Sequence, residues 1–153
     1  MSIQQILPIT GGGHWWEVKD GDDRVREVFD RHYSRIRYLD GRAPKLFVGP
    51  GEKMVLVTPE LDAIFIWRKF INADGQWGVN CAAFRNESQV LSSALIVEAE
   101  ALAWRRWPNE RLYTYVNPRK IRSSNPGCCF MKAGWRRCGI TKINKLLILE
   151  KCE

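Results

Sequence analysis

Three apolar runs in the middle of the chain predict neighbouring β-strands. They occupy residues 53–58 (KMVLVT), 63–71 (AIFIWRKFI) and 77–85 (WGVNCAAFR), and they are rich in the β-branched and aromatic residues that favour strands. The links between them, residues 59–62 and 72–75, contain turn-forming proline, aspartate, asparagine and glycine. Links this short join antiparallel neighbours, so the pattern predicts a three-stranded antiparallel meander.

Two other segments have the apolar spacing of amphipathic helices. In residues 22–35 one face consists of Val25, Val28, Phe29, His32 and Tyr33. In residues 92–107 the face consists of Leu95, Ala99, Leu102, Ala103 and Arg106, with Ile96 beside it. Pro108 ends this second helix, since proline cannot continue one. The stretch 38–52, with its glycines and prolines, is expected to be a loop long enough to bind a substrate.

The last third of the chain predicts two strands with a short helix between them. The strands are residues 111–117 (RLYTYVN) and 145–150 (KLLILE). The helix is expected at residues 126–133, with Asn125 as its N-cap, Pro126 at its first position and Gly134 in the left-handed position past its end. Residues 1–20 are expected to be an irregular arm with room for one strand.

Length and element order favour one domain spanning residues 1–153. A chain of 153 residues can bury a full core, and no repeat or linker divides it. The order helix, three strands, helix, strand, short helix, strand is that of an α+β protein with a mixed sheet. No apolar run approaches the ~20 residues of a membrane span, and the N-terminus lacks the pattern of a signal peptide. We therefore expect a cytoplasmic protein.

Net charge and cysteine content indicate possible partners and reactive groups but leave alternatives for each. The net charge of +7 suggests nucleic acid or a phosphorylated cofactor as partner, although solubility alone would also account for it. Aromatic residues lie among the basic groups, as on nucleic-acid surfaces and also in ordinary cores. Five cysteines without zinc or disulfide spacing indicate reduced packing residues. Cys128 and Cys129, in the first turn of the short helix, leave a nucleophilic thiol as a minor alternative.

Several motifs resemble one superfamily of transferases. Residues 130–135 (FMKAGW) are similar to the Tyr-x-Lys-x-Gly-Phe pattern that ends a short helix in GNAT acyltransferases, and the element order from residue 22 to 150 resembles theirs. Within that superfamily the chain looks most like the phage Mom-type DNA-modification proteins. The similar positions are His32-Tyr33-Ser34, Ser88 with Ser92-Ser93, and Asn117 ahead of the short helix with Gly127. The resemblance implies a GNAT-like fold, a central mixed, mostly antiparallel sheet flanked by helices.

The resemblance also implies a function. It implies a transferase, in the host cytoplasm if phage-encoded, that passes an acyl or aminoacyl-type group from acyl-CoA or another activated acyl donor to an amine of a DNA nucleobase. The residues expected to handle protons or orient the reactants are His32, Tyr33, Asn117 and Tyr115. A helix N-terminus is a natural anion site, and the residues expected to hold the donor there are Arg85, Ser88, Ser92 and Ser93. The residues expected to bind nucleic acid are Arg35, Arg37, Tyr38, Arg119, Lys120 and Arg122, and those that could stack on a flipped base are Trp67, Tyr38 and Trp135.

Departures from the family pattern keep other interpretations open. Residues 85–93 contain no glycine, although the family holds the CoA pyrophosphate there with a glycine-containing turn, and Phe130 replaces a frequent general-acid tyrosine. The alternatives are an acetyl-CoA-dependent N-acetyltransferase of a protein or small amine, and a non-catalytic nucleic-acid-binding protein. The simpler roles for single residues are an N-cap for Ser92, a solvated strand end for Arg85, a core residue for His32 and a turn for Asn117. A metal at His32 and a homodimer are also left open.

Overall fold

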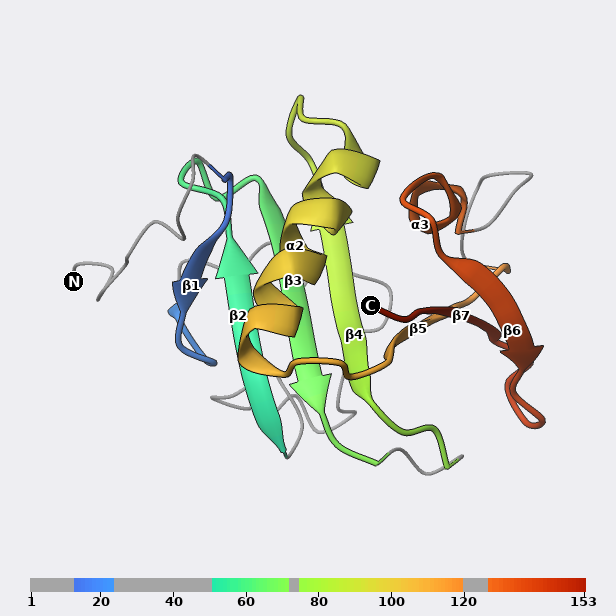
Figure 1. Ribbon diagram of the computed structural model, residues 1–153. Coiled ribbons are helices and arrows are strands. Elements are labelled where there is room, and N and C mark those ends of the chain that lie inside the picture. Colours follow the sequence, from blue (N-terminus) through green and yellow to red (C-terminus); the bar gives the residue numbers. More distant parts are fainter. Residues whose placement is uncertain (1–12, 24–50, 72–74, 120–126) are drawn as a thin grey trace, which may run out of the picture.

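Figure 1 shows the computed structural model, in which residues 13–23, 51–71, 75–119 and 127–153 are described. The helix expected at 22–35 and the loop expected at 38–52 fall outside these ranges except for their end residues. The described residues form one seven-stranded sheet with the strand order β1-β2-β3-β4-β5-β7-β6. The strands are β1 (Trp16–Val18), β2 (Glu52–Val57), β3 (Ala63–Lys69), β4 (Val79–Asn86), β5 (Leu112–Val116), β6 (Arg136–Ile140) and β7 (Leu147–Lys151).

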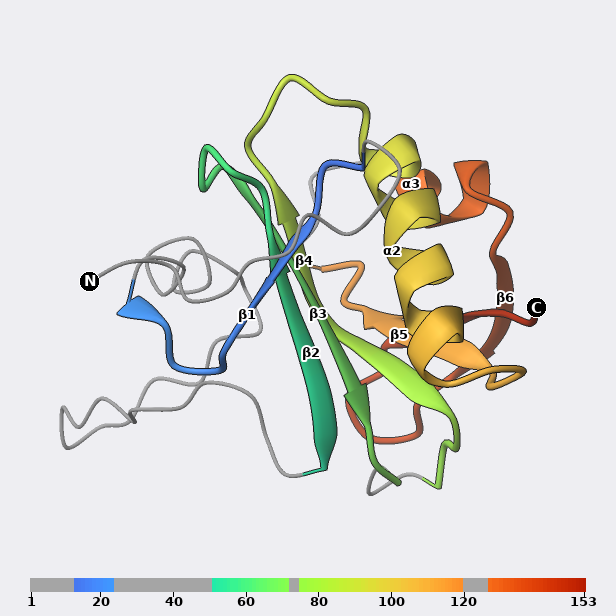
Figure 2. The ribbon, with the colours of Figure 1, turned by 60° about the vertical axis from the view of Figure 1, so that its left-hand side comes forward.

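The sheet is mixed, since β4 and β5 run parallel while the other paired neighbours run antiparallel. The α+β class is therefore confirmed, and so is the antiparallel meander, which is β2-β3-β4. Two helices are described, α2 (Ser92–Arg106) and α3 (Cys128–Lys132), and Figure 2 shows both on the same face of the sheet. Helix α2 connects the parallel pair, as a crossover helix normally does.

The short helix differs from its prediction at the N-terminal end. It begins at Cys128 with Gly127 as its N-cap, so the predicted cap Asn125 and first helical residue Pro126 are wrong. Gly127 has a φ of 81°, and a Cβ there would lie 2.7 Å from Leu149 Cδ1, so close packing on β7 and left-handed backbone both require glycine. Gly134, with a φ of 98°, follows the helix end as predicted.

Side-chain alternation divides the buried residues between the two faces of the sheet. The helix face carries the larger cluster, which includes Phe65, Trp67, Leu112 and Leu149. The opposite face carries a smaller aliphatic cluster, which includes Val55, Ile64 and Ile66. Neighbouring residues in a strand point to opposite faces, so continuous apolar runs such as AIFIW in β3 serve both clusters.

Tryptophan indole groups fix α2 on the sheet. Trp15 donates its Nε1–H to the carbonyl of Leu95 at 2.8 Å, and Trp67 donates to the carbonyl of Ala99 at 3.0 Å. Both rings are buried, so each brings a large apolar surface and satisfies its one polar atom at the same time. Trp15 and Trp67 therefore combine core packing with a fixed attachment of α2.

A buried carboxylate joins α2 to both α3 and β7. Glu100, only 2% exposed, accepts a hydrogen bond from Trp135 Nε1 at 2.7 Å and pairs with Lys151 Nζ at 2.7 Å. Lys151 Nζ also donates to the carbonyl of Ala133 at the end of α3. A buried charge is tolerated only when it is paired and hydrogen-bonded, and both oxygens of Glu100 are.

A second ion-pair cluster lies where β5, β7 and β6 meet. Glu150 accepts a hydrogen bond from Arg111 Nε at 2.7 Å and pairs with Arg136 through its other oxygen. Arg111 also donates to the carbonyl of Trp77 and contacts Cys138 Sγ. The hydrogen bond from Arg111, with the positive charges of both arginines, holds the pKa of Glu150 below its usual 4.5.

None of the helices in the described residues combines the length and the apolar character that crossing a bilayer requires.

The strand expected at 145–150 is β7. The C-terminal part also contains one strand that the sequence did not predict, β6, which is the last strand of the sheet.

We expect Glu100→Gln to lower the free energy of unfolding by about 2–3 kcal/mol, because the amide NH2 would replace one carboxylate oxygen and face Trp135 Nε1–H or Lys151 Nζ, donor against donor. Urea unfolding at pH 7 measures the change. The control is Glu110→Gln, which removes a half-exposed carboxylate paired with Lys69 and is expected to cost less than about 1 kcal/mol. Equal losses in the two variants would show that the buried carboxylate does not anchor the helices.

We expect the contribution of Glu150 to stability to depend on pH in the acid range. Its pKa is lowered by folding, so the contribution is fully present above about pH 4.5 and is lost as the pH falls through the lower folded value. The measurement is the difference in unfolding free energy between wild type and Glu150→Gln from pH 7 to pH 3. A difference that stays constant to pH 3 or grows on acidification would contradict the assignment.

Candidate functional site

In the unit β4-α2-β5 the ladder between the parallel strands ends before the strands themselves do. The ladder between the two parallel strands consists of the pairs Val79/Leu112, Asn80/Tyr113 and Cys81/Thr114. Beyond the last pair β4 continues to Asn86 and β5 to Val116 without further pairing between them in the described residues. The carboxyl ends of adjacent parallel strands are a common place for ligands, because loops and a helix N-terminus converge there.

An irregularity in β4 lies next to the point where the ladder ends. Opposite β3, Trp67 pairs with Cys81 and Ile66 pairs with Ala83, so Ala82 is an extra residue. Both alanines pack on the aliphatic cluster, while Phe84 returns to the helix face. Such bulges bend a strand and re-aim its side chains, and they are frequent beside active sites.

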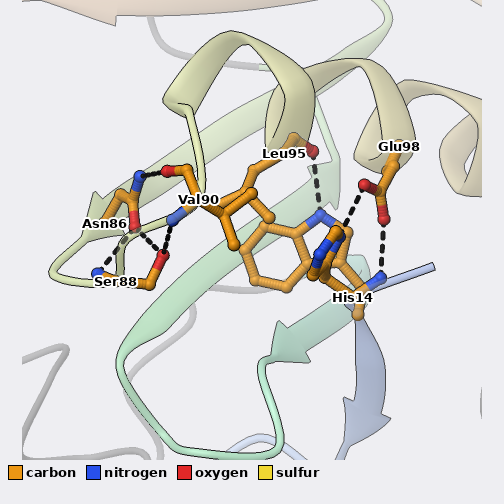
Figure 3. A network of polar contacts seen from close by, with 7 residues as sticks. His14, Asn86, Ser88, Val90, Leu95 and Glu98 are labelled. Atoms are coloured by element: carbon orange, nitrogen blue, oxygen red, sulfur yellow. Dashed lines mark hydrogen bonds and ion pairs between the residues drawn. The ribbon is translucent and has the colours of Figure 1, made fainter.

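Asn86 organises the loop that leads from β4 into α2 (Figure 3). Its Nδ2 donates to the carbonyl of Val90 at 2.7 Å and to Ser92 Oγ at 2.9 Å. Its Oδ1 accepts from the backbone N–H and the hydroxyl of Ser88, and Ser88 Oγ accepts from the N–H of Val90. Asn86 thus hydrogen-bonds the hydroxyls of both Ser88 and Ser92, two of the residues predicted to hold the donor, and the sequence analysis did not identify it. Their role in holding a donor stays a prediction.

The start of α2 has no side-chain cap. The N-cap is Leu91, not Ser92, so the capping role considered for Ser92 is wrong. No acidic residue lies in the first turn, which leaves the positive end of the helix dipole uncompensated by carboxylates of that turn. Ser92 and Ser93 are half-buried at this end. Arg85 forms an ion pair of 2.6 Å with Glu87, so an anion that uses Arg85 must compete with that carboxylate.

Two further candidate residues lie at the carboxyl end of β5. Asn117 accepts a hydrogen bond from the backbone N–H of Arg119 at 3.1 Å, so its amide forms the turn that was the simpler interpretation. Tyr115 is half-buried, and its ring meets that of Tyr113 edge to face at 5.7 Å between centroids. Tyr113 is fully buried and packs in the core. Asn86 is the last residue of β4 and Asn117 follows the last residue of β5, so both lie at the carboxyl end of this parallel pair.

The aromatic side chains on the helix face are packed against one another. Phe130 contacts Phe84 at 6.0 Å and Trp135 at 4.9 Å between ring centroids. Trp67 stacks on Trp135 at 6.3 Å, and both are buried. The prediction that Trp67 or Trp135 stacks on a flipped base is therefore wrong, because neither ring has a face open to a base.

A pairing that the sequence analysis missed lies on the outer side of α2 (Figure 3). Glu98 accepts from the backbone N–H of His14 at 2.6 Å and contacts His14 Nδ1 at 2.8 Å. These two contacts orient the exposed imidazole of His14. The two residues are 84 positions apart, so no local pattern could reveal the pair. The pair also fastens the N-terminal segment to α2.

A polar row crosses the opposite face of the sheet. Arg68, Asn80 and Tyr113 are register partners on β3, β4 and β5, and Glu150 continues the row on β7. Arg68 Nε and Asn80 Oδ1 are buried and have no hydrogen-bond partner within the described part of the chain. Buried polar atoms are normally paired, so this donor and acceptor mark a second polar position close to the ladder between β4 and β5.

Burial argues against a reactive thiol at two of the described cysteines. Burial raises the pKa of Cys129 and, more strongly, that of Cys81, which keeps both as thiols at neutral pH. Among the described residues no three His, Cys, Asp or Glu side chains converge as metal ligands would. The remaining candidate residues lie outside the described residues: His32, Tyr33, Arg35, Arg37, Tyr38, Lys120 and Arg122. Of the predicted nucleic-acid-binding residues Arg119 is described, and its Nη2 donates to the carbonyl of Asn144.

No protein family, curated protein or solved structure matches the chain. The function is therefore argued from the geometry of the described residues.

We expect Asn86→Ala to loosen the entry loop of α2, because it removes the shared partner of Ser88, Val90 and Ser92. The amide protons of residues 88 and 90 should exchange at least about tenfold faster, and unfolding should become easier by roughly 1–2 kcal/mol. Amide hydrogen exchange followed by mass spectrometry or NMR measures this. Asn144→Ala, in the exposed turn after β6, is the control. Unchanged protection of the loop in Asn86→Ala would show that the network does not hold it.

Proposed function

We propose that the protein is a GNAT-fold transferase that modifies a nucleobase of DNA by passing an acyl or aminoacyl-type group to an amine. The observation that carries the proposal is the parallel pair β4–β5, whose ladder stops at Cys81/Thr114 while an uncapped helix starts at the same end. This arrangement offers an extended donor a place between two strands and an anion a place at the start of α2.

The donor side is proposed to consist of the β4 end and the first turn of α2. A phosphate or other anionic group of the donor would meet the N–H groups of Ser92 and Ser93, where no carboxylate of that turn competes with it. Arg85 would join it after release from Glu87. Past Cys81 the β4 backbone does not pair with β5, so its polar groups can hydrogen-bond the donor instead. The fixed Asn86 loop would keep these groups in place.

The chemistry requires one bond formed, one broken and one proton moved. The nucleobase amine attacks the carbonyl carbon, a C–N bond forms, the bond from carbonyl carbon to leaving group breaks, and the proton lost by the amine reaches the leaving group. Tyr115 and Asn117 are the described candidates for guiding these groups, with His32 and Tyr33 proposed from the resemblance. His14, oriented by Glu98, is a further candidate proton acceptor.

A non-catalytic nucleic-acid-binding protein is the second candidate function. Phe130 lies in the aromatic packing with Phe84 and Trp135 and brings no hydroxyl to the ends of β4 and β5. The pairing of Arg85 with Glu87 also weakens the anion site. Both observations would suit a protein that keeps the fold and binds its partner without transferring a group.

The proposal is tested by mass spectrometry of nucleosides. The DNA is taken from cells that express the protein together with enzymes that supply the donor. We expect a modified nucleoside with wild type and its loss with Ser93→Glu. The new carboxylate compensates the helix dipole but repels an anionic donor, weakening donor binding by about tenfold or more. Ala101→Glu, exposed further along α2, makes the same charge change and should retain activity. Unmodified DNA with wild type would favour the non-catalytic protein.

A further inference from the structure

The hairpin formed by β6, the turn after it and β7 carries an excess of positive charge. Residues 136–145 (RRCGITKINK) contain Arg136, Arg137, Lys142 and Lys145 and no acidic residue. Every residue of β6 is exposed, and β6 is the last strand of the sheet (Figure 1). Arg119 adds a further cation, because its guanidinium donates to the carbonyl of Asn144 in the turn. The hairpin is therefore a compact basic surface.

Most of this charge is not neutralised by the rest of the described structure. Arg136 pairs with Glu150, but its side chain remains 77% exposed. No carboxylate in the described part of the chain pairs with Arg137, Lys142 or Lys145. Exposed cations grouped on one projecting element are the electrostatic footprint of a polyanion site.

The turn of the hairpin combines these cations with exposed apolar side chains and a defined backbone. Ile140 is 59% exposed and Ile143 is 89% exposed. The N–H of Thr141 donates to the carbonyl of Leu146 at 2.9 Å, and Thr141 Oγ1 accepts from the N–H of Leu146 at 2.9 Å. Lys142, Ile143 and Lys145 therefore stand on a closed turn, where ordering them on binding costs less conformational entropy than on a loose loop.

The base of the hairpin is held firmly by the ion-pair cluster of Arg111 and Glu150. Arg111 contacts Glu150 of β7 and Cys138 of β6, and its guanidinium lies 4.6 Å from the centroid of the Trp77 ring. Trp77 is itself 62% exposed, so an aromatic ring lies beside the basic hairpin. Exposed aromatic and basic side chains together are typical of nucleic-acid surfaces.

We propose that the β6–β7 hairpin binds double-stranded DNA through its turn, residues 141–146, and the exposed strand β6. Strand β7 is paired with β5 from Leu147 to Lys151 and is mostly buried, so the parts of the hairpin that can face a duplex are β6 and the turn. The turn lies beyond the end of the β5–β7 ladder and is the part that enters the major groove, which is roughly 12 Å wide. Arg137, Lys142 and Lys145 contact phosphates, and Ile143 at the turn meets apolar base edges such as the thymine methyl group. This inference rests on the proposed function in taking DNA as partner, and it names the surface that receives it.

The same charges have a simpler interpretation, since basic residues on an edge strand prevent pairing with other sheets. That role accounts for Arg136 and Arg137 on β6 itself. It does not account for Lys142 and Lys145, which lie in the turn beyond the edge, nor for an isoleucine exposed between them. An RNA helix is a poorer partner, because its major groove is too deep and narrow for side chains to read.

The test is the binding of a fluorescent 20-base-pair duplex, measured by anisotropy between 50 and 300 mM salt, with the full chain. Lys142→Ala/Lys145→Ala should weaken binding at 100 mM salt by about tenfold or more and reduce the slope of log K against log salt by about 1.8, which corresponds to two phosphate contacts. Lys19→Ala/Arg105→Ala removes two exposed charges elsewhere and should change neither the affinity nor the slope by a comparable amount. Ile143→Ser should weaken binding without changing the slope.

Each other outcome has a distinct meaning. Equal binding by wild type and Lys142→Ala/Lys145→Ala would overturn the hairpin as the site while leaving DNA as partner. Absence of duplex binding by wild type at 50 mM salt would overturn both the hairpin and the proposed DNA substrate, as would binding only to anionic lipid vesicles or only to RNA. Hairpin-dependent duplex binding without any modified nucleoside in cells would support the hairpin and contradict the transferase.

Sedimentation must show the same oligomeric state for all variants. A change confined to the hairpin variants would overturn DNA binding by the hairpin and identify this edge of the sheet as a self-association surface instead.

Discussion

The arrangement of the helices depends on one buried carboxylate. Glu100 projects from the centre of α2 and receives the indole N–H of Trp135 and the ammonium group of Lys151. Trp135 follows α3 and Lys151 ends β7, so a single side chain joins three elements that are far apart in sequence. The apolar contacts between α2 and α3 would permit several relative positions, because hydrophobic attraction has little directionality. Hydrogen bonds to a buried charge have strict geometry, and they select one of those positions.

This constraint matters for the ends of β4 and β5 beyond their shared ladder. With α2 held by Trp15, Trp67 and Glu100, its first turn keeps a fixed place at the carboxyl end of β4. The Asn86 network then orders the loop between strand and helix. Core packing thus holds the start of α2 and the unpaired end of β4 in place, which is what the proposed anion site would require.

Much of the fold follows from local sequence patterns. The parts that do not follow from them differ for identifiable physical reasons. The central strands and α2 are buried on one or both sides, so apolar periodicity reveals them. Strand β6 is exposed along its whole length, and a segment such as RRCGI offers no apolar face to detect. The cap of α3 was misassigned because asparagine and proline are good local signals, whereas Gly127 is required by the position of Leu149 in another strand.

The sequence identified several residues of the candidate site, but it did not reveal the contacts that these residues make. Ser88 and Ser92 were identified from the sequence, but Asn86, which hydrogen-bonds both, was not. Glu98 and His14 are distant in sequence, and so are Glu100 and its partners Trp135 and Lys151, so no local pattern pairs them. Trp67 and Trp135 were assigned to base stacking because aromatic residues near basic ones suit that function, yet their burial depends on tertiary packing that no local window contains.

The parallel pair also divides the sheet mechanically. On one side lie the antiparallel strands β1 to β4 and on the other β5, β7 and β6, and the two halves share a ladder of three residue pairs reinforced by the hydroxyl of Thr114 on the carbonyl of Cys81. A small rotation about this joint would widen or narrow the space between the free strand ends without breaking either half. The hydrogen bonds of Glu100 to Trp135 and Lys151 span the same joint, from α2 to the C-terminal strand, and would oppose such a rotation.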